Sequence, residues 1–191
     1  EEKPLSVLIM PPINRSTNVE AKEYFYTTLN VPILNAGYYV IPPFLSMEIL
    51  KRESAYDSEL FIERPSLKIF NNIFGADIIL FTIINKWDKS SIGSKVTVEV
   101  EYILKSTHTN EILYSRKGTI SYNTSISSGG GALLNILASA VNTAATKYVD
   151  VAKAANNYIF TDLPKGKYSP MFGLDKEEMA GLKVIKVRLP K

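Results

Sequence analysis

The chain has 191 residues, of which 46% are hydrophobic and 21% are charged, and its formal net charge is +3. This composition is typical of one globular domain with a buried core, and the small charge does not suggest a nucleic-acid binder. The absence of cysteine and the single histidine exclude disulfides, thiolate metal sites and multi-histidine metal sites.

The N-terminal segment predicts a parallel pair of strands. An apolar strand is expected over 5–10, and Thr17 with Glu20 forms a Thr-x-x-Glu capping box that predicts a helix start. A second strand is expected over 38–41, so the helical region between the two strands is the crossover of a strand–helix–strand unit. Such units pair their strands in parallel with a right-handed connection.

The segment 75–88 is the centre of the predicted sheet. It is apolar over 78–84, where Thr82 is the only interruption. A strand with one buried face alternates apolar and polar residues, so this nearly continuous apolar run predicts a strand that is covered on both faces. Helices are expected before it, over 44–51 and from Pro65 onward.

A long antiparallel hairpin follows. Apolar and polar residues alternate over 96–104, a turn is expected at 107–110, and 112–122 is the returning strand. The predicted fold class is therefore α/β (α+β), with a mixed sheet of parallel strands plus a long antiparallel hairpin and helices on both faces.

An alanine-rich helix of about seven turns is expected over 132–156. Polar residues at Asn135, Asn142 and Thr143 interrupt it, which argues against a membrane span. Our hypothesis is that one side of this helix covers the sheet and the alanine side meets a second copy of the protein. The predicted homodimer interface comprises Ala138, Val141, Ala144, Ala145 and Tyr148.

The C-terminal segment is expected to extend the domain. We assign 1–173 to a single α/β domain and 174–191 to an extension with a short helix over 175–181 and an edge strand over 182–189. Lysine and arginine recur along that strand. They predict either a solvated edge that resists aggregation or attachment to an anionic partner or membrane surface.

The residues give little support for catalysis. Glu99 and Glu101 point the same way along one strand, and we interpret them as a polar face in water. His108 lies in a predicted turn, and the chain has no Gly-x-Ser-x-Gly motif. The run 128–131 is interpreted as a flexible elbow, with anion binding at a helix start as the alternative. No cofactor and no metal site is predicted.

Four aromatic residues are candidates for an exposed contact patch: Tyr38, Tyr39, Phe44 and Trp87. The alternative for Trp87 is a core position at the rim of the sheet, where its ring is packed and its indole N–H has a hydrogen-bond partner.

An ordered set of residues carries a family resemblance: Pro12, Asn14, Ser16, Ala21, 24–29, Pro32, 37–40, Pro65, 74–77, Trp87, Asp88, 96–102, Thr109, 111–113, 129–131, Ala155 and Asn156. In this order and spacing, over 5–170, the chain resembles a family of bacterial outer-membrane lipoproteins of unassigned function that includes a neisserial surface-antigen lipoprotein.

The resemblance implies a location and a fold. Members are anchored by a lipid on a cysteine, which here would lie upstream of Glu1, so the expected location is the bacterial periplasm at the outer membrane. The implied fold is similar to the N-terminal domain of the periplasmic Tol–Pal component, to the curli-secretion lipoprotein and to lipoprotein activators of cell-wall synthases. The resemblance also implies a homodimer, and it supplies no catalytic residues.

Together these observations favour a non-enzymatic envelope lipoprotein that serves as a homodimeric accessory or scaffold in envelope transport or assembly, with an unidentified envelope protein as partner. One alternative is an activator that docks on a cell-wall synthase. Another is a small-ligand-binding module at the carboxyl ends of the parallel strands, which predicts a closed cavity of about 300 Å³ or more with converging polar groups.

Overall fold

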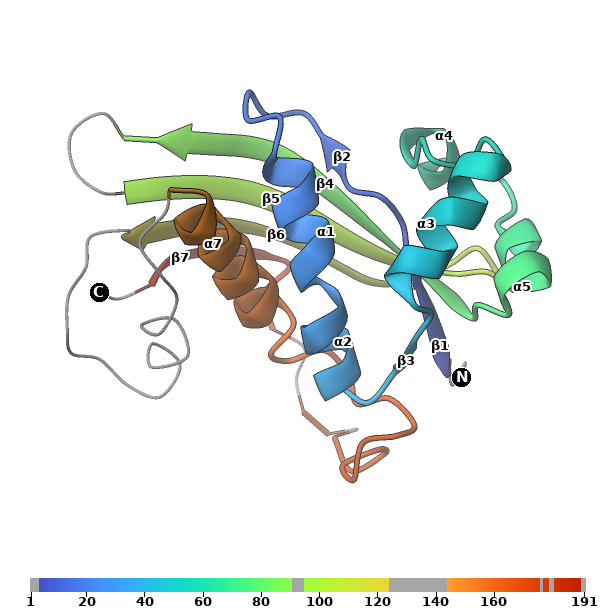
Figure 1. The fold of residues 1–191 in the computed structure, drawn as a ribbon. Helices are drawn as coiled ribbons and strands as arrows, with labels where there is room; N and C mark the ends of the chain where they lie inside the picture. The colour runs from blue at the N-terminus through green and yellow to red at the C-terminus, as the bar shows by residue number, and fades with distance from the viewer. Residues whose placement is uncertain (1–3, 91–94, 124–143, 176, 179–180, 190–191) are drawn as a thin grey trace.

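A mixed sheet runs the length of the molecule, and helices pack on it (Figure 1). The computed structural model describes residues 4–90, 95–123, 144–175, 177–178 and 181–189. The elements in chain order are β1 (Ser6–Ile9), β2 (Ile13–Asn14), α1 (Ala21–Thr28), α2 (Asn30–Asn35), β3 (Tyr39–Val40), α3 (Pro43–Arg52), α4 (Glu59–Ile62), α5 (Lys68–Phe74), β4 (Ile78–Lys89), β5 (Lys95–Ser106), β6 (Ile112–Asn123), α7 (Ala144–Ile159) and β7 (Val184–Leu189).

The strand order is β3-β1-β4-β5-β6-β7, and β2 pairs with β4 off this path. β1 is parallel to both β3 and β4, β2 is parallel to β4, and β7 is parallel to β6. β4, β5 and β6 pair in antiparallel fashion. The predicted mixed sheet, in which a long hairpin is added to parallel strands, is confirmed.

Helices cover both faces of the first half of β4. Leu80 and Ile84 belong to a front cluster with residues of α1, α2 and α7. Ile79, Phe81 and Ile83 belong to a rear cluster with residues of α3, α4 and α5. Because successive side chains of a strand point to opposite faces, a strand buried twice needs an apolar residue at every position. The nearly continuous apolar run therefore predicted this environment correctly.

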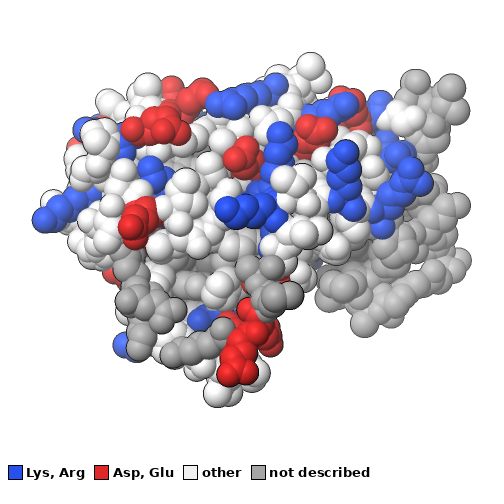
Figure 2. Space-filling view, turned by 180° about the vertical axis from the view of Figure 1, so that it is seen from behind, with Lys and Arg blue, Asp and Glu red and all other residues white. Residues whose placement is uncertain are grey.

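The hairpin is covered on its front face along β5, and on its rear face only near the end of β5, where Ile103 belongs to the rear cluster and Lys105 is buried. Val98, Val100 and Tyr102 are fully buried in the front cluster, on which α7 packs. Glu99 and Glu101 alternate with them on the rear face, where acidic and basic side chains are interspersed (Figure 2). This alternation is the pattern from which the hairpin was predicted.

The predicted capping box at the start of α1 is wrong. The helix begins at Ala21 with Glu20 as its N-cap, and no side chain caps it. Instead, Asn18 Oδ1 accepts the Glu20 N–H at 3.0 Å, and the Asn18 carbonyl accepts the Ala21 N–H at 3.2 Å. The Glu20 carboxylate accepts a hydrogen bond from the Tyr24 hydroxyl one turn further on, so it is not available to the backbone.

The C-terminal half matches the sequence in part. The described part of the predicted helix over 132–156 is α7, and its expected start lies outside the described residues. The expected edge strand is present as β7, on the outside of the sheet. Among the described residues of 175–181 only turn and bend backbone occurs where a short helix was expected.

Candidate functional site

The four aromatic residues proposed as one contact patch do not lie on one surface. Tyr38 and Trp87 are buried, and the Tyr38 hydroxyl donates a hydrogen bond of 2.9 Å to the Pro164 carbonyl. Trp87 packs edge-on against Phe25 at a centroid distance of 6.0 Å. It lies on the front face of β4 beneath α1 and α7, so the alternative core position is the correct one.

The other two aromatic residues are exposed and have apolar neighbours in the chain. Tyr39 lies on the edge strand β3 with half of its surface exposed, and Phe44 at the start of α3 is 79% exposed. Leu45 and Ile49 of α3 are exposed as well and lie one helical turn apart. We call these four residues, Tyr39, Phe44, Leu45 and Ile49, the β3–α3 apolar surface.

The helix for which a dimer interface was predicted, α7, packs its apolar side against the rest of the molecule. Val151, Ala152, Ala155 and Ile159 of α7 are fully buried in the front cluster, against the sheet and α1. Tyr148 also turns inward, because its ring packs edge-on against Trp87 at 6.0 Å and lies 6.2 Å from the ring of Tyr24.

Tyr148 therefore packs within the molecule with part of its side chain exposed, and its role in a dimer interface stays a prediction. Ala138 and Val141 lie outside the described residues. Ala144 and Ala145 form the start of α7.

An open hollow of about 620 Å³ lies where the parallel strands β2 and β4 end. Thr17 and Asn18 follow β2, residues 86–90 end β4, and Tyr148 reaches the hollow from α7. Lys95 and Thr97 of β5 complete it. The carboxyl ends of parallel strands are where open α/β sheets bind ligands, and the volume is within the usual range for small-molecule sites.

Lysines dominate the charge of this hollow. Lys86 forms an ion pair of 2.9 Å with Asp88, and this hydrogen-bonded carboxylate raises the pKa of Lys86. Lys89 Nζ lies 5.5 Å from the centre of the Tyr148 ring. Within the part of the chain that the structure describes, neither Lys89 nor Lys95 forms an ion pair, so the lining has an excess of positive charge.

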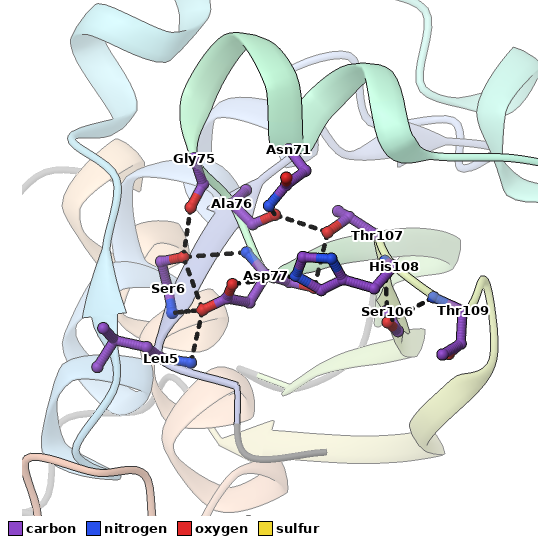
Figure 3. Close-up of polar contacts among 10 residues, drawn as sticks. All are labelled: Leu5, Ser6, Asn71, Gly75, Ala76, Asp77, Ser106, Thr107, His108 and Thr109. Carbon is purple, nitrogen blue, oxygen red and sulfur yellow. Dashed lines mark hydrogen bonds and ion pairs between the residues drawn. The ribbon is translucent and has the colours of Figure 1, made fainter.

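Ser6, Asp77 and His108 come together at the opposite end of β4, as shown in Figure 3. Asp77 Oδ2 accepts hydrogen bonds from the N–H groups of Leu5 and Ser6 at 2.8 and 3.0 Å and from the Ser6 hydroxyl at 3.1 Å. Asp77 Oδ1 lies 3.2 Å from Nε2 of His108. The cluster thus contains the three residue types of a serine-hydrolase triad.

The order of contacts in this cluster is wrong for a nucleophile. A catalytic histidine must contact the serine hydroxyl, whereas here the carboxylate lies between the two. The Ser6 hydroxyl also bonds the Gly75 carbonyl at 2.7 Å. Burial alone would raise the pKa of Asp77, but the N–H groups of Leu5 and Ser6 and the His108 side chain lower it. The cluster joins β1, β4 and the 107–110 turn.

The other residues considered for catalysis or metal binding form no such site among the described residues. In the register of the sheet, Glu99 lies opposite Lys86 and Glu101 opposite Lys117, as expected for a charged face in water. No group of three or more acidic or histidine side chains gathers to hold a metal within the described residues. The run 128–131 lies outside them. No helix in the described segments is long and apolar enough to span a bilayer.

Comparisons with known proteins agree with this architecture. The family described as "Putative lipoprotein GNA1162-like" matches residues 1–166. The chain belongs to this family. A lipoprotein of Neisseria meningitidis serogroup B is 29% identical over 144 residues, which cover 74% of this chain and 65% of that protein's length.

The crystal structure of lipoprotein GNA1162 from Neisseria meningitidis has a TM-score of 0.60 and 25% identity, and the match covers 80% of this chain and 99% of that chain. The C-terminal domain of LpoB from Escherichia coli is more distant, at 18% identity and a TM-score of 0.42, with 61% of this chain and 82% of that chain covered. Membership in the GNA1162-like family assigns the chain to the cell envelope, as the resemblance implied.

Sequence reasoning missed the lysines of the hollow. Lys86 belongs to the stretch that was interpreted only as the end of the central strand, Lys89 was assigned to the loop after it, and Lys95 was placed after that loop without a role. The available signal was the clustering of Lys-Trp-Asp-Lys at the carboxyl end of that strand, where ligand sites of α/β sheets occur.

Proposed function

We propose that this protein is a non-enzymatic lipoprotein domain of the bacterial envelope that acts as a homodimeric accessory or scaffold in envelope transport or assembly. The observation that carries the proposal is the β3–α3 apolar surface, which leaves Phe44 79% and Leu45 59% exposed. Exposed apolar side chains that gather on one part of a soluble domain are typical of a protein-contact site.

The polar clusters support a structural role over catalysis. The Ser6–Asp77–His108 cluster joins two strands and a turn. A second cluster pairs the buried Arg116 with Asp162, and Arg116 Nη1 also donates a hydrogen bond of 3.0 Å to the Ile159 carbonyl. Both clusters connect segments that are distant in the sequence, and neither contributes residues to the hollow.

The partner is best sought by crosslinking in whole cells. A photo-crosslinking amino acid at position 44 of the full-length protein is expected to capture an envelope protein, because that side chain projects from the surface. The matched control carries the same amino acid at position 117 on the charged rear face. Equal capture at both positions, or none at position 44, would contradict the proposed contact surface. Capture of a cell-wall synthase would favour the activator alternative.

The homodimer is a separate part of the proposal. It rests on the alanine-rich residues of the predicted helix, of which Ala138 and Val141 are the central ones. Light scattering during size-exclusion chromatography at tens of micromolar is expected to give twice the chain mass. A monomer at that concentration would contradict the proposed homodimer but would not bear on the proposed contact surface.

The proposed location is the periplasmic side of the outer membrane, with a lipid on a cysteine upstream of Glu1. Fractionation of cells that express the full-length protein is expected to recover it with the outer membrane. Replacement of the upstream cysteine by serine should move it to the soluble periplasmic fraction. Recovery in the inner membrane would contradict the location.

A further inference from the structure

We propose that the hollow at the ends of β2 and β4 is a binding site for an anionic sugar, a molecule whose ring carries a phosphate or a carboxylate. The proposal is independent of the scaffold role, because the β3–α3 apolar surface comes from other elements.

The excess positive charge of the lining favours an anionic ligand. Of the three lysines, only Lys86 has a carboxylate partner, Asp88, among the described residues. Lys89 and Lys95 come from the end of β4 and the start of β5, the two ends of one strand connection. Ammonium groups form charge-assisted hydrogen bonds with phosphate and carboxylate oxygens, which are stronger than bonds between neutral groups. In the register of the sheet, Lys89 lies opposite Val96 on the front face, where it is beside Tyr148, whereas Lys95 lies on the other face with Lys86. The Lys89 ammonium group, which has no ion-pair partner among the described residues, is therefore the group suited to hold such an anion next to the aromatic rings.

The aromatic side chains of the lining favour a ligand that contains a ring. Trp87 and Tyr148 both contribute to the hollow, and their rings pack edge-on at a centroid distance of 6.0 Å. Trp87 is only 4% exposed, so it supplies an edge, whereas the half-buried Tyr148 supplies a larger area. An aromatic surface beside Lys89 matches a molecule with an apolar ring next to a charged group.

Neutral polar groups complete the match to a sugar. Asn18 uses its Oδ1 atom to accept the Glu20 N–H, and its amide nitrogen donates no hydrogen bond within the described part of the chain. The exposed Thr17 lies beside it. Groups of this kind bind hydroxyls, of which a sugar ring offers several. The volume of about 620 Å³ is enough for a monosaccharide or a disaccharide.

The chain contains its own reporter for this site, because Trp87 is its only tryptophan. Titration of the protein with glucose 6-phosphate or glucuronate is expected to change the tryptophan fluorescence to saturation, and calorimetry should give the same dissociation constant. Glucose and inorganic phosphate are the controls for the ring and for the charge. Either control binding as tightly as the anionic sugars would overturn the proposal.

Variants locate the site. Lys89→Ala is expected to weaken binding of glucose 6-phosphate roughly tenfold, since it removes a charge-assisted hydrogen bond beside Tyr148. Lys95→Ala is expected to weaken it less, because Lys95 lies on the other face of the sheet. Both lysines are exposed, so the fold is expected to survive, and circular dichroism checks this. Lys117→Ala on the rear face is the matched control. Unchanged affinity in both hollow variants, or an equal loss in the control, would overturn the assignment.

The anionic sugar can be free or can be the head of a glycolipid, and vesicles distinguish these sources. Co-sedimentation with phosphatidylcholine vesicles that contain lipid A, reversed by glucose 6-phosphate, would support the proposal with a glycolipid as source. Binding of the free sugar without co-sedimentation would support it with a soluble ligand. Equal co-sedimentation with vesicles that contain phosphatidylglycerol, or binding in neither arm, would overturn it.

Discussion

The two halves of β4 are adjacent stretches of one strand in different environments. From Ile78 to Ile84 every residue is buried, because helices pack on both faces. From Lys86 onward only Trp87 is buried, because the rear helices no longer cover the strand. A register shift lies between these halves. The comparison shows that burial follows the number of covering layers and not the strand as a unit.

The largest expected effect comes from the doubly covered half. Phe81→Ala should lower the free energy of unfolding by about 3–5 kcal/mol, because the removed ring is fully buried in the rear cluster. Urea denaturation followed by circular dichroism measures this loss. Lys86→Ala, in the other half of the same strand, is the control and should stay within about 0.5 kcal/mol. Similar losses in both variants would contradict the comparison.

A smaller effect is expected where α7 covers the hairpin. A Cβ atom at Gly118 of β6 would lie 2.5 Å from Ile159 Cδ1, so Gly118→Ala should force the helix and sheet apart slightly. Such overpacking typically costs about 1–3 kcal/mol, measured as a lower midpoint of thermal or urea unfolding. The double variant with Ile159→Val tests the cause. This double variant should regain part of the stability that Gly118→Ala loses. If it regains none, the contact with α7 is not the cause of the loss.

Acid is expected to lower the free energy of unfolding, because two carboxylates, Asp77 and Asp162, have lowered pKa values in the folded protein. Hydrogen bonding with Arg116 lowers the pKa of Asp162, and the pKa of Asp77 is lowered by its N–H donors and His108 against the opposing effect of burial. The stabilisation from a carboxylate with a lowered pKa is complete above the unfolded pKa of about 3.9 and is lost as the pH falls through the folded pKa.

Both carboxylates are partly exposed, so each contributes about 1 kcal/mol or less. Urea unfolding between pH 7 and pH 3 measures the loss. Asp77→Asn together with Asp162→Asn should flatten the pH dependence. An unchanged slope in this double variant would assign the acid sensitivity to other groups.

The smallest expected effect comes from the rear face of the hairpin. Glu99→Ala should change the free energy of unfolding by less than about 0.5 kcal/mol, because the side chain is partly exposed and faces Lys86 across the sheet. Urea denaturation beside the unmodified protein measures it. A loss above 1 kcal/mol would mean that the rear face has a covering layer in solution.

The sequence predicted those parts of the fold that depend on burial patterns. The nearly continuous apolar run 78–84 and the alternation over 96–104 identified β4 and the hairpin, because side-chain periodicity directly reflects how many faces are covered. Asn110, the last residue of the expected turn at 107–110, has a φ of 66°. These features are local, so nearby residues determine them.

Features that depend on distant contacts were not predictable. Trp87 is buried because α1 and α7 pack over it, and Thr17 does not cap α1 because Asn18 forms the turn. The hollow combines residues that follow β2 with residues of β4, β5 and α7. Only the spatial arrangement of the chain shows that they lie together, and the spacing of lysines alone does not.

The parallel pairing of β1 with β4 has a consequence for the order of folding. β1 precedes β4 in the chain, and Ser6 and Asp77, which fix its position, are separated by 71 residues. Closing so large a loop is slow, whereas the β4–β5–β6 meander forms between neighbours in the chain. The pairing of β1 with β4 is therefore expected to form only after the middle of the chain has been made, whereas its pairing with β3 needs a shorter loop.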